Sequence, residues 1–252
     1  MAEERGAVEK VVETLFFTLL YVSNPSRDFF YAPLDGAEES FFGDSLAITN
    51  KVFAFEFKRS LGSAGAELGK YGKRTEAEFA RFLVNHSSSR AVDPLDLLRL
   101  SHRGHALVAL RQDCGAALGP LRGERIAEFL ESAAYLVRLC GSKEEHKPAF
   151  AEKLFHLDPP SGLSLPEAET YFDALRALRD AGGGSGGGQG DTSRVVGFFV
   201  SDADAISIAT ADSYLNFLEL VRRADRLNKK ALEEKLALNA SSGDLPRNGH
   251  SP

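Results

Sequence analysis

The amino-acid sequence predicts an α/β protein of α+β type, built on a mixed sheet flanked by helices. The first observation is a helical repeat of apolar residues at the N-terminus. The second is a run of three short strand-like segments, whose second connection is too short for a crossover and so predicts an antiparallel meander. The third is that a helix, a strand and further helices follow. This order is typical of a sheet covered by helices.

The elements of the N-terminal half are indicated by apolar spacing and by turn residues. Residues 3–22 repeat apolar side chains at helical spacing, which predicts a helix. Aromatic and β-branched segments predict four strands, at residues 28–34, 44–48, 51–58 and 105–111. The glycine-rich, basic stretch at residues 61–74 predicts a loop. Helix starts are indicated by a capping box at Thr75 and Glu78 and by the pair Asp93 and Pro94.

The sequence of the C-terminal half predicts helices before and after a second strand hairpin. Apolar residues on one side of residues 124–140 predict an amphipathic helix, and a capping box at Ser164 and Glu167 begins another. The remaining elements are a flexible glycine-rich linker at 181–193, strands at 194–200 and 205–210, and a long helix at 211–237. We expect a single domain over 1–237, with its core at about 5–112, an extension over 113–237 and a disordered tail at 238–252.

Composition argues against a broadly basic protein, a disulfide-rich protein and a membrane protein. The chain has 252 residues and a net charge of −6, which argues mildly against a broadly basic surface but leaves a local basic groove open. Cys114 and Cys140 are too few for a disulfide framework, which favours a reducing, cytoplasmic location. The N-terminus lacks a signal-peptide pattern, and the most apolar run is broken by Glu13 and too short to span a bilayer. We therefore expect no membrane partner.

The strand at residues 51–58 combines an apolar face with a charged end. Alternation places Phe53, Phe55 and Phe57 on one face, which must be core, and Glu56 and Lys58 on the other. A turn centred on Asn50 pairs residue 48 with residue 52 and residue 44 with residue 56. The carboxylates of Asp44 and Glu56 then stand opposite each other, with Cβ atoms about 4.5–5.5 Å apart.

Two carboxylates this close repel each other unless a proton, solvent or a cation intervenes. A solvent-exposed strand end with a Glu–Lys pair would account for the pattern, and so would a bound divalent metal ion. A register slip of one residue would separate Asp44 from Glu56.

Asp44, a hairpin and then the tripeptide EFK at residues 56–58 resemble the PD-(D/E)XK motif of the restriction-endonuclease-like nuclease superfamily. The order of elements over residues 5–112 is also similar to the core of that family: a helix, a three-strand meander that carries the motif, a helix and a strand. The resemblance implies a metal-dependent nuclease that hydrolyses phosphodiester bonds, and we expect its substrate to be DNA, with RNA as the alternative.

The resemblance also implies roles for the motif residues. Asp44 and Glu56, with the backbone carbonyl of Phe57, would hold Mg²⁺, for which Mn²⁺ would substitute. Lys58 would orient the attacking water or stabilise the pentavalent phosphorus. Asp44, Glu56 and Lys58 are thus the candidate catalytic residues.

The chain departs from the family pattern in two places. Gly43 stands where the family has a proline, and Asp35 in the earlier segment PLDG is a rival for Asp44. Some members of the family add a glutamate of the first helix to the site. Glu13 is the matching residue, with Glu9 one turn away, and either could instead be solvated.

The segment that follows the motif is locally basic. Residues 58–74 contain five basic residues against one acidic residue, Glu67. Contact with the phosphates of a nucleic acid is one interpretation, and an ordinary solvated loop is the other. The candidate nucleic-acid-binding residues are Arg59, Lys70, Lys73 and Arg74.

A second hypothesis is a protein that has the nuclease fold but does not catalyse hydrolysis. The acidic net charge and the missing proline fit a catalytically inactive nuclease-fold protein that acts as a protein-interaction or regulatory module. The sequence leaves open whether the chain forms a homodimer or binds another protein.

Overall fold

The computed structural model describes residues 2–23, 29–33, 45–48, 51–88, 93–111, 128–141, 161–183, 195–200, 206–211 and 230. Its named elements are, in chain order, α1 (Ala2–Ser23), β1 (Phe29–Pro33), β2 (Ser45–Ile48), β3 (Val52–Lys58), the 3₁₀ helix η1 (Leu61–Ala64), α3 (Gly65–Lys70), α4 (Glu76–Ser88), α5 (Pro94–Gly104), β4 (His105–Leu110), β5 (Leu130–Ala134), α7 (Tyr135–Leu139), α9 (Leu165–Gly182), β6 (Val195–Val200) and β7 (Ile206–Ala211).

The strands form one mixed sheet in the order β5-β4-β3-β2-β1-β6-β7. The pair β3–β4 is parallel, and every other neighbouring pair is antiparallel. The predicted meander of the first three strands is therefore confirmed, and so is the predicted C-terminal hairpin, which adds to the outer edge of β1. The helices η1, α3, α4 and α5 lie between β3 and β4 in the chain and supply the crossover that parallel neighbours need.

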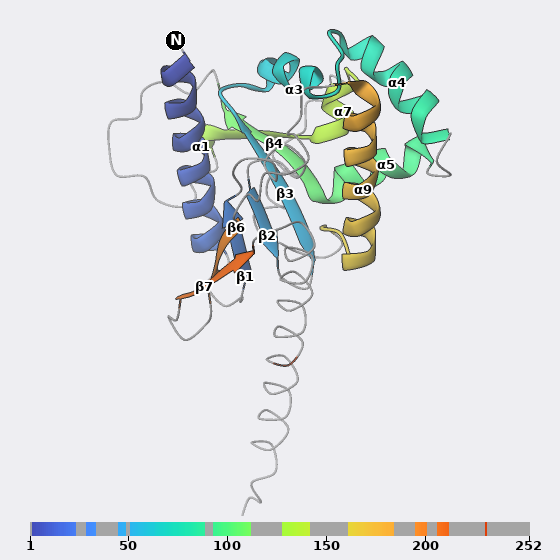
Figure 1. Ribbon diagram of the computed structural model, residues 1–252. Helices are drawn as coiled ribbons and strands as arrows, with labels where there is room; N and C mark the ends of the chain where they lie inside the picture. The colour runs from blue at the N-terminus through green and yellow to red at the C-terminus, as the bar shows by residue number, and fades with distance from the viewer. Residues whose placement is uncertain are drawn as a thin grey trace, which may run out of the picture.

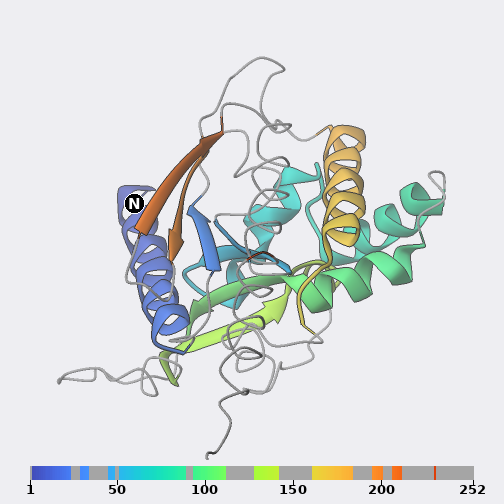
Figure 2. The same ribbon diagram turned by 90° about the horizontal axis from the view of Figure 1, so that it is seen from below.

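Helices cover both faces of the sheet. Figures 1 and 2 show α1 on one side of the sheet and α4, α5 and α9 on the other. Phe53, Phe55 and Phe57 point to the α1 side, where the ring of Phe16 lies 4.4 Å from Phe55 and 5.5 Å from Phe57 between centroids. The predicted apolar face of this strand is thus confirmed as core.

The opposite face of β3 packs against the larger group of helices. Val52 and Ala54 belong to a core cluster with side chains of α3, α4, α5, α7 and α9. The predicted helix starts are confirmed here: Asp93 accepts a hydrogen bond from the backbone N–H of Leu95 at 2.8 Å, and Thr75 caps α4. This is the face on which the charged end of β3 lies.

The register between β2 and β3 is the predicted one. Ile48 pairs with Val52, and the pairing continues to Ser45 opposite Phe55. A slip of one residue, which would reverse the faces of every side chain, is therefore excluded over these four pairs.

The prediction of a loop over residues 61–74 is wrong for its first ten residues, which form η1 and α3. Its glycines suggested a loop, but Gly65 and Gly69 face open space while Leu68 is buried in the core. Burial of one apolar side and the helical spacing of Glu67 and Lys70 outweigh the low helix propensity of glycine here.

The prediction of one helix over residues 124–140 is also wrong. Residues 130–134 form β5, antiparallel to β4, and a short helix, α7, follows. Without β5, the outer edge of β4 would leave a row of backbone N–H and C=O groups unpaired. The small residues Ala133 and Ala134 suit either a helix or a strand, so pairing with β4 decides the conformation.

Arg103 fixes the position of α9. Its guanidinium donates to both carboxylate oxygens of Glu167, at 2.7 and 3.1 Å, and to the carbonyl of Gly162 at 3.0 Å. Glu167 also accepts the N–H of Ser164 at 2.8 Å, which confirms the predicted capping box. Backbone hydrogen bonds between Leu163 and Val52 then join this segment to the start of β3.

Several predictions concern residues outside the described ranges: Asp35, Asp44, Cys114, the linker beyond Gly183 and the tail at 238–252. Of the predicted helix at 211–237, Ala211 ends β7 and Lys230 is helical, and the rest is outside the description. None of the helices described combines the length and the apolar character needed to cross a membrane.

We expect Phe55→Ala to destabilise the protein by about 3–5 kcal/mol, because Phe55 is fully buried beneath α1 and its removal leaves a cavity. Urea unfolding followed by circular dichroism measures this loss. Val84→Ala is the control, since Val84 is 53% exposed on α4, and a change below about 0.5 kcal/mol is expected there. Equal effects of the two substitutions would contradict the placement of the phenylalanine face.

Candidate functional site

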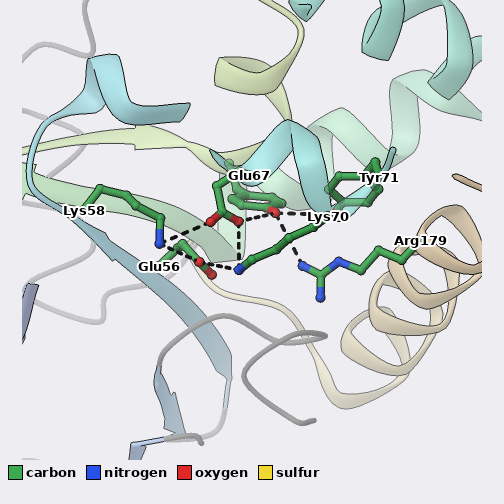
Figure 3. A network of polar contacts seen from close by, with 7 residues as sticks. Glu56, Lys58, Glu67, Lys70, Tyr71 and Arg179 are labelled. Atoms are coloured by element: carbon green, nitrogen blue, oxygen red, sulfur yellow. Dashed lines mark hydrogen bonds and ion pairs between the residues drawn. The ribbon is translucent and has the colours of Figure 1, made fainter. Parts of the chain in front are cut away.

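Four charged side chains meet between β3 and α3 (Figure 3). Glu56 and Lys58 are two residues apart on β3 and so share one face of the sheet. Glu67 and Lys70 are three residues apart on α3 and so share one side of the helix. We call these four residues the charge cluster.

Each ammonium of the charge cluster contacts both carboxylates. Lys58 Nζ lies 2.9 Å from Glu56 Oε1 and 3.2 Å from Glu67 Oε1. Lys70 Nζ lies 2.6 Å from Glu56 Oε1 and 3.0 Å from Glu67 Oε2. The four side chains therefore form a closed ring of alternating charge.

Three of the four side chains of the charge cluster are buried, both residues of β3 among them, so the alternative of a solvent-exposed strand end is wrong. Glu56 is 0% exposed, Glu67 1% and Lys58 8%. Buried charges are tolerated only when they are paired, because loss of hydration costs several kcal/mol per ion. Two carboxylates and two ammonium groups satisfy this requirement with no net charge.

Ion pairing determines the protonation states of Glu67 and Lys70. Burial alone would raise the pKa of Glu67, but Lys70 and Lys58 outweigh burial and lower this pKa to about 2. Burial alone would lower the pKa of Lys70, but Glu56 and Glu67 raise it above its ordinary value. Glu67 and Lys70 are therefore both charged at neutral pH.

A group of buried aromatic and basic side chains extends the charge cluster towards α9. Tyr135 of α7 donates a hydrogen bond to Glu67 Oε2 at 2.9 Å. The hydroxyl of Tyr71 and Nη2 of Arg179 each lie 3.4 Å from the Tyr135 hydroxyl oxygen and donate to it. Figure 3 shows Arg179 reaching from α9 towards this point. Glu67 is thus held in place from a helix outside the β3–α3 segment.

His105, at the start of β4, supports Tyr135 from the other side. Its ring stacks on the ring of Tyr135, with centroids 4.1 Å apart and planes 15° apart, and its Nδ1 lies 2.9 Å from the hydroxyl of Tyr171. Burial, with Arg179 as the second cause, lowers the pKa of His105 well below its ordinary value. His105 is therefore neutral and packs as an aromatic ring.

The structure brings together part of the predicted site. Glu56 and Lys58 meet, and Phe57 lies between them with its side chain on the opposite face and its backbone paired with Val108 of β4. Asp44, which directly precedes β2, is outside the described residues.

Glu13 belongs to the other side of the sheet. It lies on α1, where it pairs with Lys10 at 3.0 Å and accepts a hydrogen bond from the hydroxyl of Tyr31 at 3.3 Å. Tyr31 packs in the core cluster of the phenylalanine face, whereas Glu56 lies on the opposite face. The described residues therefore do not place Glu13 with Glu56.

The predicted nucleic-acid-binding residues separate into two groups. Arg59 and Arg74 are exposed near the two ends of the η1–α3 segment. Lys70 instead points inward to the charge cluster, and Lys73 lies 4.1 Å above the ring centroid of Phe82. Arg59 and Arg74 thus face solvent, whereas Lys70 and Lys73 contact other side chains.

Sequence reasoning did not identify Glu67, Tyr135 and Arg179 as parts of the site. The three-residue spacing of Glu67 and Lys70 would have indicated that they share one side of a helix. The glycines of the segment favoured a loop instead, so no helix was predicted there. Tyr135 and Arg179 reach the charge cluster only through the packing of α7 and α9, and no local pattern marks them.

Comparisons with protein-family models, curated proteins and solved structures found no match to this chain. In the part of the chain that the structure describes, no group of three or more His, Cys, Asp or Glu side chains could hold a metal ion.

We expect the stabilising effect of Glu67 to disappear in acid. Its folded-state pKa of about 2 lies below its ordinary 4.5, so its contribution is present above pH 4.5 and is lost as the pH falls towards 2. Glu67→Gln should be about 3 kcal/mol less stable than the wild type at pH 7, because it leaves the ammonium groups of Lys58 and Lys70 with one buried carboxylate between them. The difference in stability between Glu67→Gln and the wild type should become smaller as the pH falls from 4.5 towards 2.

Urea unfolding at pH 7, 4.5 and 3 measures this difference. Asp96→Asn is the control, since Asp96 is exposed on α5 and pairs with Arg99 on the surface. A Glu67→Gln deficit that stays constant over this pH range would contradict the low pKa of Glu67.

Proposed function

We propose that this chain is a metal-dependent nuclease that hydrolyses phosphodiester bonds in DNA. The observation that carries the proposal is the buried meeting of Glu56 and Lys58, 2.9 Å apart at one end of a strand in the middle of the sheet. The EFK tripeptide thus has its charged groups gathered on one face, as the resemblance to the PD-(D/E)XK superfamily implies. The alternative substrate in this proposal is RNA.

The arrangement of elements supports the same proposal at the level of the fold. An N-terminal helix, an antiparallel meander, intervening helices and a strand parallel to β3 follow one another in the order expected of a restriction-endonuclease-like core. The register found between residues 45–48 and 52–55 is the one on which the expected pairing of Asp44 with Glu56 depends.

The charge cluster offers a magnesium ion carboxylate oxygens, the ligands that this ion prefers, from two residues in the described part of the chain. Glu56 and Glu67 already hold a cation between them, the ammonium of Lys70, which is 2.6 and 3.0 Å from their oxygens. Mg²⁺ is commonly bound by one or two carboxylates together with water and phosphate oxygens. Glu56, Asp44 and the carbonyl of Phe57 would hold it, and it would supply an acidified water and neutralise phosphate charge.

The chain's own basic residues complete the proposed chemistry. Lys58, fixed by ion pairs with Glu56 and Glu67, presents a positive charge that orients the attacking water or stabilises the phosphoryl oxygens. Arg59 and Arg74 are exposed near the ends of the η1–α3 segment, where they would contact the phosphate backbone of the substrate.

A second candidate function is a catalytically inactive nuclease-fold module that binds a protein partner. The observation that favours it is that Lys58 and Lys70 already balance both carboxylates of the charge cluster. A site neutral without a metal ion has no electrostatic need of one.

A cleavage assay separates the two candidates. The purified chain should cut plasmid or linear DNA when Mg²⁺ or Mn²⁺ is added, and Glu56→Gln should reduce the rate at least about 100-fold, since loss of even an indirect metal contact costs about 10–100-fold. The control is Arg99→Gln, a change in a surface ion pair on α5, which should cut like the wild type.

Lys58→Met should also abolish cleavage, and it should lower stability by about 3 kcal/mol because the buried carboxylates lose one of their two ammonium partners. Folding of this variant is checked by circular dichroism below its melting temperature. No cleavage of any DNA or RNA by the wild type, together with no stabilisation by Mn²⁺, would favour the inactive module.

A further inference from the structure

We propose that Arg179 and Tyr135 are positioning residues for Lys58. They act through Glu67, whose carboxylate stands between the Tyr135 hydroxyl and the Lys58 ammonium (Figure 3). The position of the lysine of the EFK tripeptide then depends on a side chain of α9, in the other half of the chain. This inference rests on the proposed function for its effect on cleavage, whereas the effect on the Lys58 ammonium is measured without a substrate.

Polar atoms in direct contact connect Arg179 to Lys58. Nη2 of Arg179 lies 3.4 Å from the hydroxyl oxygen of Tyr135, and that hydroxyl donates to Glu67 Oε2 at 2.9 Å. The other carboxylate oxygen, Oε1 of Glu67, lies 3.2 Å from Lys58 Nζ. A carboxylate held at both oxygens has a fixed orientation. A change at Arg179 therefore reaches Lys58 through two intermediate side chains.

These contacts are shielded from water, which makes them effective. Arg179 is 4% exposed, Tyr135 0% and Glu67 1%. Hydrogen bonds in a buried chain are stronger than in water and polarise one another, so the loss of one contact weakens the next. Solvent does not screen the guanidinium from the carboxylate at this depth.

Tyr135 is held so that its own proton faces Glu67. Its ring stacks on the ring of His105, with centroids 4.1 Å apart. Its hydroxyl oxygen accepts from the hydroxyl of Tyr71 and from Arg179, each at 3.4 Å. A phenolic hydroxyl has one proton, and with both donors on the oxygen that proton is left for Glu67. Arg179 and Tyr71 thus set the direction in which Tyr135 donates.

The last turn of α9 brings Arg179 to this point. Gly182, three residues further on, lies so close to the turn after α3 that a Cβ atom there would overlap the carbonyl oxygen of Tyr71. Such a close approach of two backbones favours glycine. The end of α9 is therefore seated directly against the segment that follows Glu67, and Arg179 is fixed with it.

The NMR signal of the Lys58 ammonium tests the proposal on the full chain without a substrate. Rapid proton exchange with water removes the signals of exposed lysine ammonium groups, whereas buried, ion-paired groups keep theirs. The signal is assigned by its loss in Lys58→Met. In Tyr135→Phe and Arg179→Met the Lys58 signal should shift and broaden or be lost. Arg179→Lys keeps a positive charge on α9 and should preserve the signal.

Arg103→Met is the matched control. Arg103 anchors the opposite end of α9, where it contacts Glu167 and the carbonyl of Gly162. Urea unfolding should show a loss of stability in both Arg103→Met and Arg179→Met. The Lys58 signal should stay unchanged in Arg103→Met, so the comparison separates the position of Lys58 from the stability of α9.

Cleavage kinetics extend the test to the proposed nuclease. Tyr135→Phe and Arg179→Met should lower kcat by about 100-fold, since a displacement of about 1 Å in a reacting group can have that effect. KM should not change, because the exposed Arg59 and Arg74 are left intact. The double variant should be no slower than Tyr135→Phe alone, because the effect of Arg179 passes through Tyr135.

A measurement on the wild type does not depend on the folding of a variant. The hydroxyl proton of Tyr135 should exchange slowly with water and show a nuclear Overhauser contact to the side chain of Glu67. Absence of this contact overturns the proposal, because the path from α9 to the charge cluster runs through it.

The outcomes distinguish this inference from the nuclease proposal. A Lys58 signal that is the same in the wild type, Tyr135→Phe and Arg179→Met overturns the positioning role, even if the protein cuts DNA. An equal change of the Lys58 signal in Arg103→Met and Arg179→Met overturns it as well. A Lys58 signal that changes as expected in a protein that cuts no nucleic acid supports the positioning role and contradicts the nuclease proposal.

Discussion

The pairing of two glutamates with two lysines between β3 and α3 is the interaction on which the surrounding structure depends. Glu56 and Glu67 would not be stable in a dry interior alone, and neither would their ammonium partners, so strand and helix must pack together. That packing places Glu67 where Tyr135 reaches it, and Tyr135 in turn receives Arg179 from α9. Buried polar contacts thereby join four elements: β3, α3, α7 and α9.

The sheet could be predicted to the extent that its signals are local. Alternation of Phe53, Phe55 and Phe57 marks a buried face, and the short connection at Asn50 sets the register of β2 against β3. Residues 130–134 could not be assigned in this way, because their apolar residues fit helical spacing as well. Their strand conformation comes from the free edge of β4, which is a property of the folded sheet and not of the segment.

The same distinction explains what could be predicted of the site. Glu56 and Lys58 were found because they are two residues apart on one strand. Glu67 is eleven positions from Glu56, on a helix whose glycines suggested a loop, and Arg179 lies on an element from the other half of the chain. These residues act together only through tertiary packing, which no short-range pattern encodes.

The place of the C-terminal hairpin in the sheet has a consequence for how the chain folds. Phe30 of β1 pairs with Phe199 of β6, whereas its other neighbour, Ile48, is close in sequence. Contacts between distant segments form slowly, because closing a long loop has a high entropic cost. During synthesis the meander is therefore complete while the outer side of β1 still awaits its partner. An unpaired strand edge attracts other chains, so aggregation is a hazard of this interval and ends when β6 docks.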